Sequence, residues 1–432
     1  MGSDAELKGL YRLLSSEFVD ASALNCQHAV TTAERARQSG RVYAIHDTTE
    51  FEFPHADPAE VGYLRTGRAG FELHYALVVD ARSGQQRPLG VANAEAMFRD
   101  SRPRKRSKGK KARNKSGAET VRDPERRSLR WSRGFAAVAA ALDGVEVIHL
   151  ADREGDNYEL LGSAVQRGQR FVVRVRVHGR QVRTGSGQAG ALKPLMEQCA
   201  GLLTREVPLS ARRKRPEPQA SRIHPPRAAR LAELHFASQP VVLPRPRYQS
   251  PELPEELRLN VVRVFERNPP TGETPVEWLL FTTESVSTPA EVAAVVDAYR
   301  ARWLIEECNK AIKTGCKYEE RQVESRDGLL TLLAMTLPIA TEVLWLRSRS
   351  RELPDGPARS VLTTAQLQVL RVLGPRKLGP APTLHDALWA VAGLGGHLAR
   401  NGEPGWLVLH RGMLKLCAYE EAWIAARARG NL

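Results

Sequence analysis

Between residues 41 and 178, strand-like and helix-like segments alternate, and this order limits the possible folds more than any other feature of the sequence. Three strands come first; they include the apolar segment 41–51 and segment 71–80, whose period-two alternation predicts a half-buried strand. Helix 128–142, strand 145–152, helix 157–168 and strand 170–177 follow in that order. This succession is typical of an α/β domain.

The remainder of the chain divides where its composition changes. Pro- and Arg-rich segments interrupt the α/β pattern and separate short strands, which predicts a β-rich insertion. A long helix is expected over 287–315, capped by Ser287 or Thr288 and ended by Gly315. The predicted organisation is a helical region 1–40, an α/β segment 41–178, a β-rich insertion 179–275, a segment 276–350 containing the long helix, and a helical domain 355–432.

The chain carries a large positive charge. Its 64 Lys and Arg against 49 Asp and Glu give a net charge of +15, which indicates a polyanionic partner, most simply nucleic acid. Ribosome binding or heparin-like binding would give the same balance. The segment 102–115 holds basic but no acidic residues, so it is expected to be a solvated loop that either contacts DNA or only adds solubility.

Cysteine content and apolar segments indicate a soluble, cytoplasmic protein. The five cysteines are scattered and show no C-x-x-C spacing, which favours reduced thiols over disulfides or a zinc module. The N-terminal segment has no apolar core of a secretory signal. The longest apolar segment, 329–341, contains Pro338 and is too short to span a bilayer, so no membrane partner is expected.

Two aspartates follow predicted strands, and a glutamate lies on the long helix. Asp47 is expected at the end of one strand and Asp152 just beyond another, where α/β sheets often place functional groups, although turns and helix caps use Asp there as well. The helix contributes Glu306 on one stripe with other polar residues, a spacing that also fits a salt-bridged surface helix. The members of the stripe are Tyr299, Arg302, Glu306 and Lys313.

Together the three carboxylates form a set that suits metal-dependent phosphoryl transfer. Asp47, Asp152 and Glu306 are expected to hold two Mg²⁺ or Mn²⁺ ions about 4 Å apart, because hard cations prefer carboxylate oxygens. Arg302 and Lys313 are then placed to bind phosphates beside the scissile bond. This chemistry agrees with the basic charge of the chain.

The motif Y-x-x-R-x-x-x-E-x-x-x-x-x-x-K in YRARWLIEECNKAIKTG resembles the YREK signature of the bacterial insertion-sequence-four transposases. The segments HDTTEFEF and ADREGDNYELL are similar to those that carry the first and second catalytic aspartates of that family. The resemblance runs from about Tyr11 to the C-terminal helices. It implies a ribonuclease-H-like core interrupted by a β-rich insertion, 41–178 being the first part of that core and 276–350 its end.

The resemblance also implies roles for individual residues. Asp47, Asp152 and Glu306 would be the metal-binding DDE triad, while Tyr299, Arg302 and Lys313 would contact phosphates at the transposon ends. Trp278 would stack on a flipped base, although a strand tryptophan also fits a core position. Arg153 and Arg174 would contact DNA; alternatively, Arg153 pairs with Glu154 or Asp156, and Arg174 belongs, with Arg176, to a salt-bridged strand face. The implied reaction is nicking, hairpin formation, hairpin opening and strand transfer into target DNA.

Two regions outside the core bear on the function that the resemblance implies. Residues 384–398 and the GEPGW turn are similar to the family's helical dimerisation region, so a homodimer on DNA is expected. Residues 1–40 resemble only the last part of the family's end-recognition domain. The alternatives to an active transposase are a truncated, non-cleaving protein that inhibits full-length transposase in mixed dimers, and a stand-alone metal-dependent nuclease.

Overall fold

The computed structural model describes residues 4–82, 86–103, 126–212 and 225–429, together with 119, 121 and 123. Most of the basic segment 102–115 lies outside these residues. The contacts divide the chain into two compact units, and each is described by itself. Unit 1 consists of Met1–Ala112, Ala140–Glu146 and Trp303–Leu432, and unit 2 consists of Arg113–Ala139 and Val147–Arg302.

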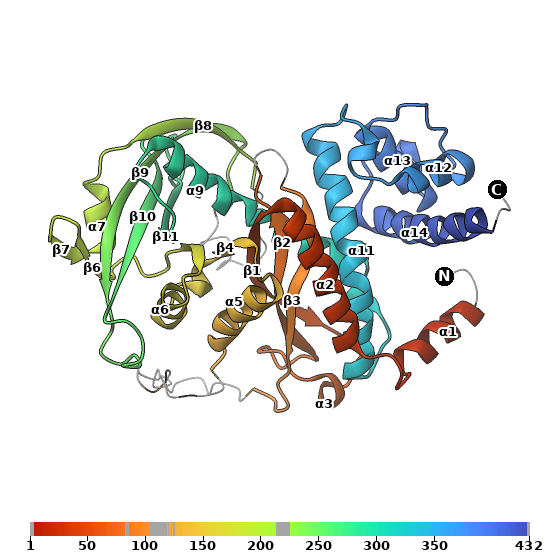
Figure 1. Ribbon diagram of the computed structural model, residues 1–432, viewed down its shortest axis with the longest axis horizontal. Helices are drawn as coiled ribbons and strands as arrows, with labels where there is room; N and C mark the ends of the chain where they lie inside the picture. The colour runs from red at the N-terminus through yellow and green to blue at the C-terminus, as the bar shows by residue number, and fades with distance from the viewer. Residues whose placement is uncertain are drawn as a thin grey trace. The chain divides into compact units, whose positions relative to one another are not determined.

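Unit 1 is built on three antiparallel strands in the order β3-β2-β1, with Asp47 of β1 directly opposite Tyr75 of β2. Helices α2 and α11 pack on β3, and α2 also packs on β2 (Figure 1). All residues of β2 are buried, so the expectation that this strand is half-buried was wrong. The reason is that β2 lies between two strands while α2 covers it and Tyr75 reaches a second helix, α10. The strands are β1 (Arg41–Glu52), β2 (Gly70–Asp80) and β3 (Pro88–Met97).

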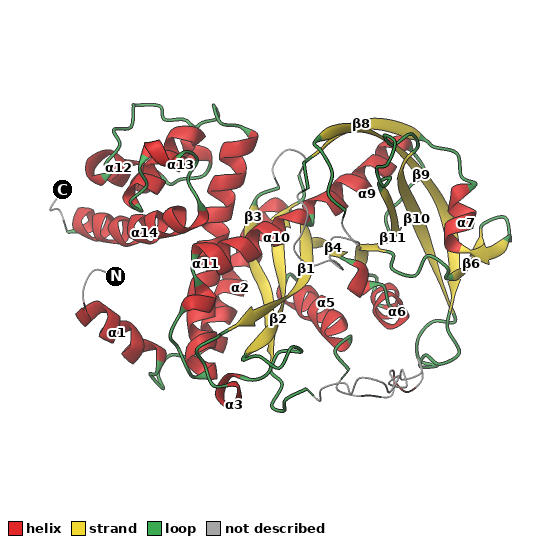
Figure 2. Ribbon diagram, turned by 180° about the vertical axis from the view of Figure 1, so that it is seen from behind, coloured by secondary structure: helices red, strands yellow, loops and turns green. Residues whose placement is uncertain are grey.

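The helices of unit 1 include a C-terminal group, α12 to α14, that packs together and against α11. Thr363 and Thr383 begin α12 and α13 with capping boxes, which satisfy the first backbone amides of each helix. Helix α10 packs on β1 (Figure 2). The α-helices of this unit are α1 (Asp4–Leu14), α2 (Ala21–Ser39), α3 (Pro58–Val61), α10 (Trp303–Lys310), α11 (Arg326–Glu352), α12 (Thr364–Leu373), α13 (Leu384–Leu394) and α14 (Trp406–Ala428).

Helix α11 is the one described helix that is long and apolar enough to cross a membrane by composition. It extends well beyond the apolar segment 329–341 and continues through Pro338, so the argument from a short apolar segment was wrong. Its most apolar window is 67% buried inside the protein, as in the core helix of a soluble protein. The burial of α11 inside the protein, and not the length of its apolar segment, is therefore consistent with a soluble protein.

Unit 2 contains a mixed sheet in the order β4-β5-β11-β10-β9-β6-β7, with β8 paired to β9. Strands β4 and β5 are parallel, and the other pairs are antiparallel. In the described part of 179–275, strands β6 to β10 extend the same sheet. The elements are α5 (Leu129–Ala141), β4 (Glu146–Ala151), α6 (Tyr158–Gln166), β5 (Arg170–Arg174), β6 (Gln181–Thr184), β7 (Ala189–Ala191), α7 (Leu192–Glu197), β8 (Leu203–Leu209), β9 (Arg230–Pro244), β10 (Glu256–Glu266), β11 (Glu277–Thr282) and α9 (Pro289–Ala301).

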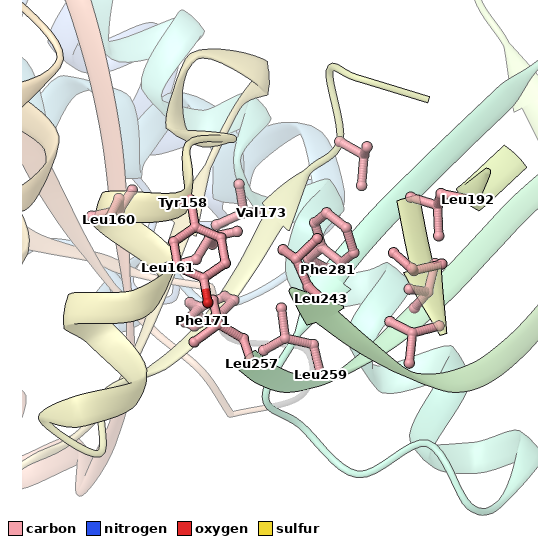
Figure 3. Close-up of a cluster of buried hydrophobic side chains, with 14 of the residues drawn as sticks. Tyr158, Leu160, Leu161, Phe171, Val173, Leu192, Leu243, Leu257, Leu259 and Phe281 are labelled. Carbon is pink, nitrogen blue, oxygen red and sulfur yellow. The ribbon is translucent and has the colours of Figure 1, made fainter. Parts of the chain in front are cut away.

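One hydrophobic cluster joins the α/β part of unit 2 to the insertion. Phe171 and Phe281 of β5 and β11 pack in the same cluster as Leu243 and Leu257 of β9 and β10 (Figure 3). Side chains of α6, including Tyr158, belong to the same cluster (Figure 3). The fold is thus α/β with mixed strands and C-terminal helices, and the insertion shares a core with the strands that precede and follow it.

The long helix expected over 287–315 is interrupted. Helix α9 starts with a capping box between Thr288 and Glu291, as expected for a cap at this position. At Arg302 the backbone amide bonds to the carbonyl of Tyr299, three residues back, and α10 begins at the next residue. One π-helical turn, η2 (Ala311–Gly315), ends the segment. The expectation of one continuous long helix was therefore wrong, because the hydrogen-bond pattern changes twice along the segment.

The five cysteines are free thiols that differ in exposure. Cys26 on α2 is exposed, whereas Cys308 and Cys316 are buried. Burial raises the pKa of the Cys308 thiol to about 12 and that of Cys417 to about 11. Burial likewise raises the pKa of Cys199 and of Cys316. Four of the thiols are thus held in the protonated form.

Candidate functional site

Asp47 lies in the middle of β1. This strand continues for five residues beyond Asp47, paired with β2 as far as Glu52 opposite Gly70. The expectation that Asp47 ends a strand was therefore wrong. The polar sequence DTTE resembles a strand end, but here it belongs to a strand whose pairing with β2 continues.

A chain of hydrogen bonds connects the Asp47 carboxylate to the core of unit 1. The Asn309 amide nitrogen Nδ2 donates to Asp47 Oδ2 at 3.1 Å. The Tyr75 hydroxyl donates to Asn309 Oδ1 at 2.9 Å and lies 3.4 Å from the backbone carbonyl of Ile305. Strands β1 and β2 and helix α10 thus meet at one polar chain.

Glu306 belongs to the same surroundings. Burial raises the pKa of the Tyr75 phenol well above its usual value, and the nearby Cys308, Asp47 and Glu306 raise it further. Tyr75 is completely buried. Helix α10, which carries Glu306, packs on β1, and Asn309, three residues after Glu306, contacts Asp47, so the two carboxylates belong to neighbouring elements of unit 1.

Sequence reasoning did not identify Asn309 or Tyr75. Asn309 follows Glu306 by three residues in α10, the spacing at which helical side chains are neighbours, and this was the available signal. For Tyr75 the only sequence signal was its place in a strand with alternating apolar residues. That pattern predicts that the side chain is buried but does not identify its hydrogen-bond partner.

Lys313 lies on η2 and is directed at β1. Its Nζ donates to the backbone carbonyl of Glu50, lies 3.6 Å from the Glu319 carboxylate and 5.4 Å from the centre of the Phe51 ring. The ammonium is thus held by several contacts with the first unit's strand and the following turn. A single exposed surface pair would hold it less firmly.

Asp152 lies directly after β4, as predicted from the sequence. It is the N-cap of a single 3-10 turn, η1 (Arg153–Gly155), and its Oδ1 accepts the backbone amide of Glu154 at 2.8 Å. Glu154 in turn pairs with the guanidinium of Arg130, whose side chain is largely buried. Asp152 can cap the turn and still have a functional role. The hydrogen bond from the Glu154 amide orients the carboxylate but does not neutralise its charge.

The carboxylates suggested as partners of Arg153 have other partners. Besides the pairing of Glu154 described above, the buried Asp156 carboxylate pairs with Arg180 at 2.7 Å and accepts the backbone amide of Arg176 at 2.7 Å. Asp156 therefore stabilises the loop after β5. The Arg153 side chain is exposed.

Three residues of unit 2 form what we call the aromatic–arginine cluster: Arg174, Trp278 and Tyr299. The Arg174 guanidinium carbon lies 5.6 Å from the Trp278 ring centre, and the rings of Trp278 and Tyr299 are 5.7 Å apart at 66°. Trp278 is half-buried rather than part of the core. Strand β5 ends at Arg174, so the expected alternation of Arg174 and Arg176 along one strand was wrong.

The electrostatics of the cluster connect it to Asp152 and Arg302. Burial raises the pKa of the Tyr299 phenol, Arg302 and Arg174 oppose this, and Asp152 adds to it. Burial also lowers the pKa of the Arg174 guanidinium. A guanidinium stays protonated under these conditions. The cluster therefore holds a positive charge against the Trp278 ring, and the charge of Asp152 acts on the Tyr299 phenol of the same cluster.

The described residues contain no group of three or more His, Cys, Asp or Glu side chains arranged to hold a metal ion. Mg²⁺ commonly binds proteins through one or two carboxylates, with waters and substrate phosphates completing its octahedron. The pair Asp47 and Glu306 fits that donor requirement, because both are carboxylates from elements that pack together. Asp152 is in the second unit.

The structure thus groups the predicted residues in two sets. Unit 1 places Asp47 and Glu306 around the Tyr75–Asn309 chain, with Lys313 on η2. Unit 2 places Asp152 and Arg302 with the aromatic–arginine cluster, and Arg153 on the exposed turn beside Asp152. The first set is suited to binding a hard cation, and the second to binding a phosphate and a base. No family model matches the chain.

Proposed function

We propose that this protein is a DDE transposase that excises and inserts a DNA element by metal-dependent phosphoryl transfer. The observation that carries the proposal is the packing of α10, which carries Glu306, on β1, where the amide of Asn309, one helical turn from Glu306, bonds to Asp47. Asp47 and Glu306 are two of the acids that the resemblance to insertion-sequence-four transposases assigns to the metal site. The third is Asp152. The net charge of +15 supports a nucleic-acid substrate.

In this proposal the two carboxylates of unit 1 are metal ligands. Asp47 and Glu306 supply hard oxygen donors for Mg²⁺ or Mn²⁺, and Asp152 adds a third by resemblance. Two such ions would polarise a phosphoryl oxygen and lower the pKa of a bound water or hydroxyl. Lys313, held against β1, is placed to neutralise a phosphate near Glu306.

The first reaction step in this proposal is hydrolysis of the bond between phosphorus and the 3′ oxygen at the element's end. The oxygen of water bonds to phosphorus, and the 3′ oxygen leaves as a hydroxyl after taking up a proton. That hydroxyl then loses its proton and bonds to a phosphorus of the opposite strand, and the 3′ oxygen of the flanking DNA leaves that phosphorus as a hydroxyl, which closes a hairpin. Asp47 and Glu306 serve both steps from one position, because each step is the same displacement at phosphorus.

The aromatic–arginine cluster is proposed to hold the DNA end. Arg174 provides a permanent cation and Trp278 a half-exposed ring, a combination that binds a phosphate and an unstacked base. Arg302 and Tyr299 are proposed to contact the neighbouring phosphates, with Arg153 from the turn beside Asp152. We further propose that the protein acts in the cytoplasm as a homodimer on double-stranded DNA.

The test is cleavage of a duplex carrying the inverted repeats that flank this reading frame, with Mg²⁺ or Mn²⁺ present. A transposase yields a nicked strand and then a hairpin, both visible on denaturing gels and both lost with chelator or in Asp47→Ala. Glu50→Ala, on the same strand with an exposed side chain, is the control and is expected to retain cleavage.

Two other results would replace the proposal. Nicks without hairpins on any duplex would indicate a stand-alone nuclease. Binding to DNA or to a full-length transposase, together with inhibition and no cleavage, would indicate the truncated inhibitor.

A further inference from the structure

The Tyr75–Asn309 chain can have only one hydrogen-bonding direction when Asp47 is ionised. An ionised carboxylate only accepts hydrogen bonds, so the Asn309 atom 3.1 Å from Asp47 Oδ2 is the amide nitrogen. Asn309 Oδ1 then faces Tyr75 at 2.9 Å and needs a donor, which the phenol supplies because it keeps its proton at neutral pH. The negative charge on Asp47 thus determines which atom donates in each of the two hydrogen bonds, from Asn309 to Asp47 and from Tyr75 to Asn309.

The three residues come from three different elements, which makes the arrangement rigid. Asp47 and Tyr75 are direct cross-strand partners in β1 and β2, and Asn309 comes from α10. Tyr75 is completely buried and its hydroxyl also approaches the carbonyl of Ile305 in α10. The side-chain amide is therefore held at both ends, and the carboxylate that it contacts is restricted in rotation.

We propose that Asn309 is a positioning residue, fixed by Tyr75, that orients the Asp47 carboxylate for the divalent cation. This inference rests on the proposed function, since it assigns a role toward that metal site. Partners of this kind commonly set the orientation and basicity of metal ligands. Without the amide, Asp47 would rotate more freely and would lose part of its orientation before the metal binds.

A purely structural role for the chain makes a different prediction. If Asn309 and Tyr75 only joined α10 to the strands, their loss would lower stability and leave metal affinity unchanged in the folded protein. The decisive measurement is therefore metal binding to folded protein. Free Mn²⁺, measured by its electron paramagnetic resonance signal during titration of the full chain, gives this affinity directly.

The main variant is Asn309→Leu, which removes both hydrogen bonds at similar side-chain size. It is expected to weaken Mn²⁺ binding by about 10- to 100-fold. Tyr75→Phe, which leaves the amide in place, is expected to weaken binding by a smaller factor, roughly 3- to 10-fold. Asn309→Gln keeps the amide and is expected to recover part of the loss. Cleavage should follow the same order at low Mg²⁺ and approach the wild-type rate at saturating Mg²⁺.

Two matched controls separate positioning from stability. Tyr318 is also completely buried in unit 1 and donates its hydroxyl to the Leu329 carbonyl at 2.7 Å, so Tyr318→Phe removes a comparable bond. Asn260 donates its amide to the Glu284 carbonyl at 2.7 Å in unit 2, so Asn260→Leu matches the main variant. Both controls should bind Mn²⁺ as the wild type does, with thermal unfolding confirming that each variant is folded.

The outcomes distinguish the two proposals. If the wild type binds Mn²⁺ and cleaves DNA but folded Asn309→Leu and Tyr75→Phe bind Mn²⁺ like the controls, the positioning role is refuted and the proposed function stands. If the wild type neither binds Mn²⁺ nor cleaves, the proposed function fails and the positioning role fails with it. Weaker binding in both variants, with partial recovery in Asn309→Gln, supports the inference.

Discussion

The two sets of candidate residues are built in opposite ways. In unit 1, the Asp47 carboxylate accepts from a neutral hydrogen-bond chain that leads to a buried phenol, and Glu306 lies on the helix that supplies Asn309. In unit 2, Arg174 is a cation against the half-exposed ring of Trp278, with Tyr299 packed edge-on behind it. One set depends on directed hydrogen bonds, and the other on stacked surfaces and charge.

This difference separates two requirements of a nucleic-acid enzyme. A metal ligand must have its oxygens fixed in direction, and hydrogen bonds to neutral partners achieve this without cancelling its charge. A surface that holds DNA must accept bases of any identity, and aromatic faces with an arginine do so because every base has a π-face. We therefore expect substitutions of Asp47 and Glu306 to affect the reaction, and substitutions in the aromatic–arginine cluster to affect binding.

The largest effect is expected from removing an acid of unit 1. Asp47→Ala or Glu306→Gln should lower the rate of metal-dependent cleavage at saturating DNA by about a thousandfold, because several kcal/mol of charge stabilisation is lost. Affinity for the duplex, measured by fluorescence anisotropy without metal, should stay within about twofold of the wild type. Comparable loss of DNA affinity in these variants would break the separation of reaction from binding.

A smaller effect is expected when the half-buried ring of Trp278 in unit 2 is removed. Trp278→Leu should weaken binding of the DNA end by about 1–3 kcal/mol, which is roughly 5- to 150-fold, since base stacking on the ring is lost. Trp278→Phe keeps a flat ring and should lose less. Anisotropy titrations measure both, and equal loss in the two variants would show that the ring acts by packing rather than by stacking.

The charge of Arg174 should appear mainly in the salt dependence of binding. Arg174→Gln is expected to reduce the slope of log affinity against log salt concentration by about 1, the value for one lost phosphate contact. Arg258, in the same unit, has a side chain that is 86% exposed, so Arg258→Gln is the matched control. An unchanged slope for Arg174→Gln would assign that guanidinium to packing against Trp278.

The smallest effect is an acid sensitivity that both units should share. Burial lowers the pKa of His28 and His410 in unit 1 to about 4, and that of His149 in unit 2 to about 3. Because the unfolded chain binds these protons near pH 6.5, stability should be full above that pH and fall steadily toward pH 4. Thermal unfolding midpoints between pH 8 and pH 4 measure this.

The histidine variants test whether the acid sensitivity is shared between the units. His149→Leu should flatten the dependence contributed by unit 2, and the double variant His28→Leu with His410→Leu should flatten that of unit 1. A flat profile in the wild type, or one removed completely by a single variant, would contradict the shared origin.

Local patterns were enough to predict much of the fold. The Ala-rich segment 128–142 corresponds to α5, and the apolar segment 145–152 corresponds to β4. Both were predictable because the first has a clear helical period, the second is a mostly apolar run, and polar residues mark their ends. Asp152 was placed correctly for the same reason: an apolar strand ends immediately before it. Asp47 was misplaced because pairing with β2 continues through a polar stretch, and pairing is not a local property.

The remaining features depend on contacts between distant segments. Asn309 acquires its role from Tyr75 and Asp47, which reach it from two other elements, and no spacing in the sequence shows this. The interruption at Arg302 likewise carries no Pro or Gly to mark it. Burial of β2 on all sides could not be read from its alternating pattern, because helices packed on the strand decide it.

The uneven exposure of the thiols has a practical consequence. Maleimides react with thiolates, and burial keeps Cys199, Cys308, Cys316 and Cys417 protonated, while Cys26 on α2 is exposed. A brief reaction near neutral pH should therefore attach one fluorophore to the native sequence, at Cys26. Such a conjugate would report assembly of the protein–DNA complex by energy transfer to end-labelled oligonucleotides, and no cysteine would have to be substituted.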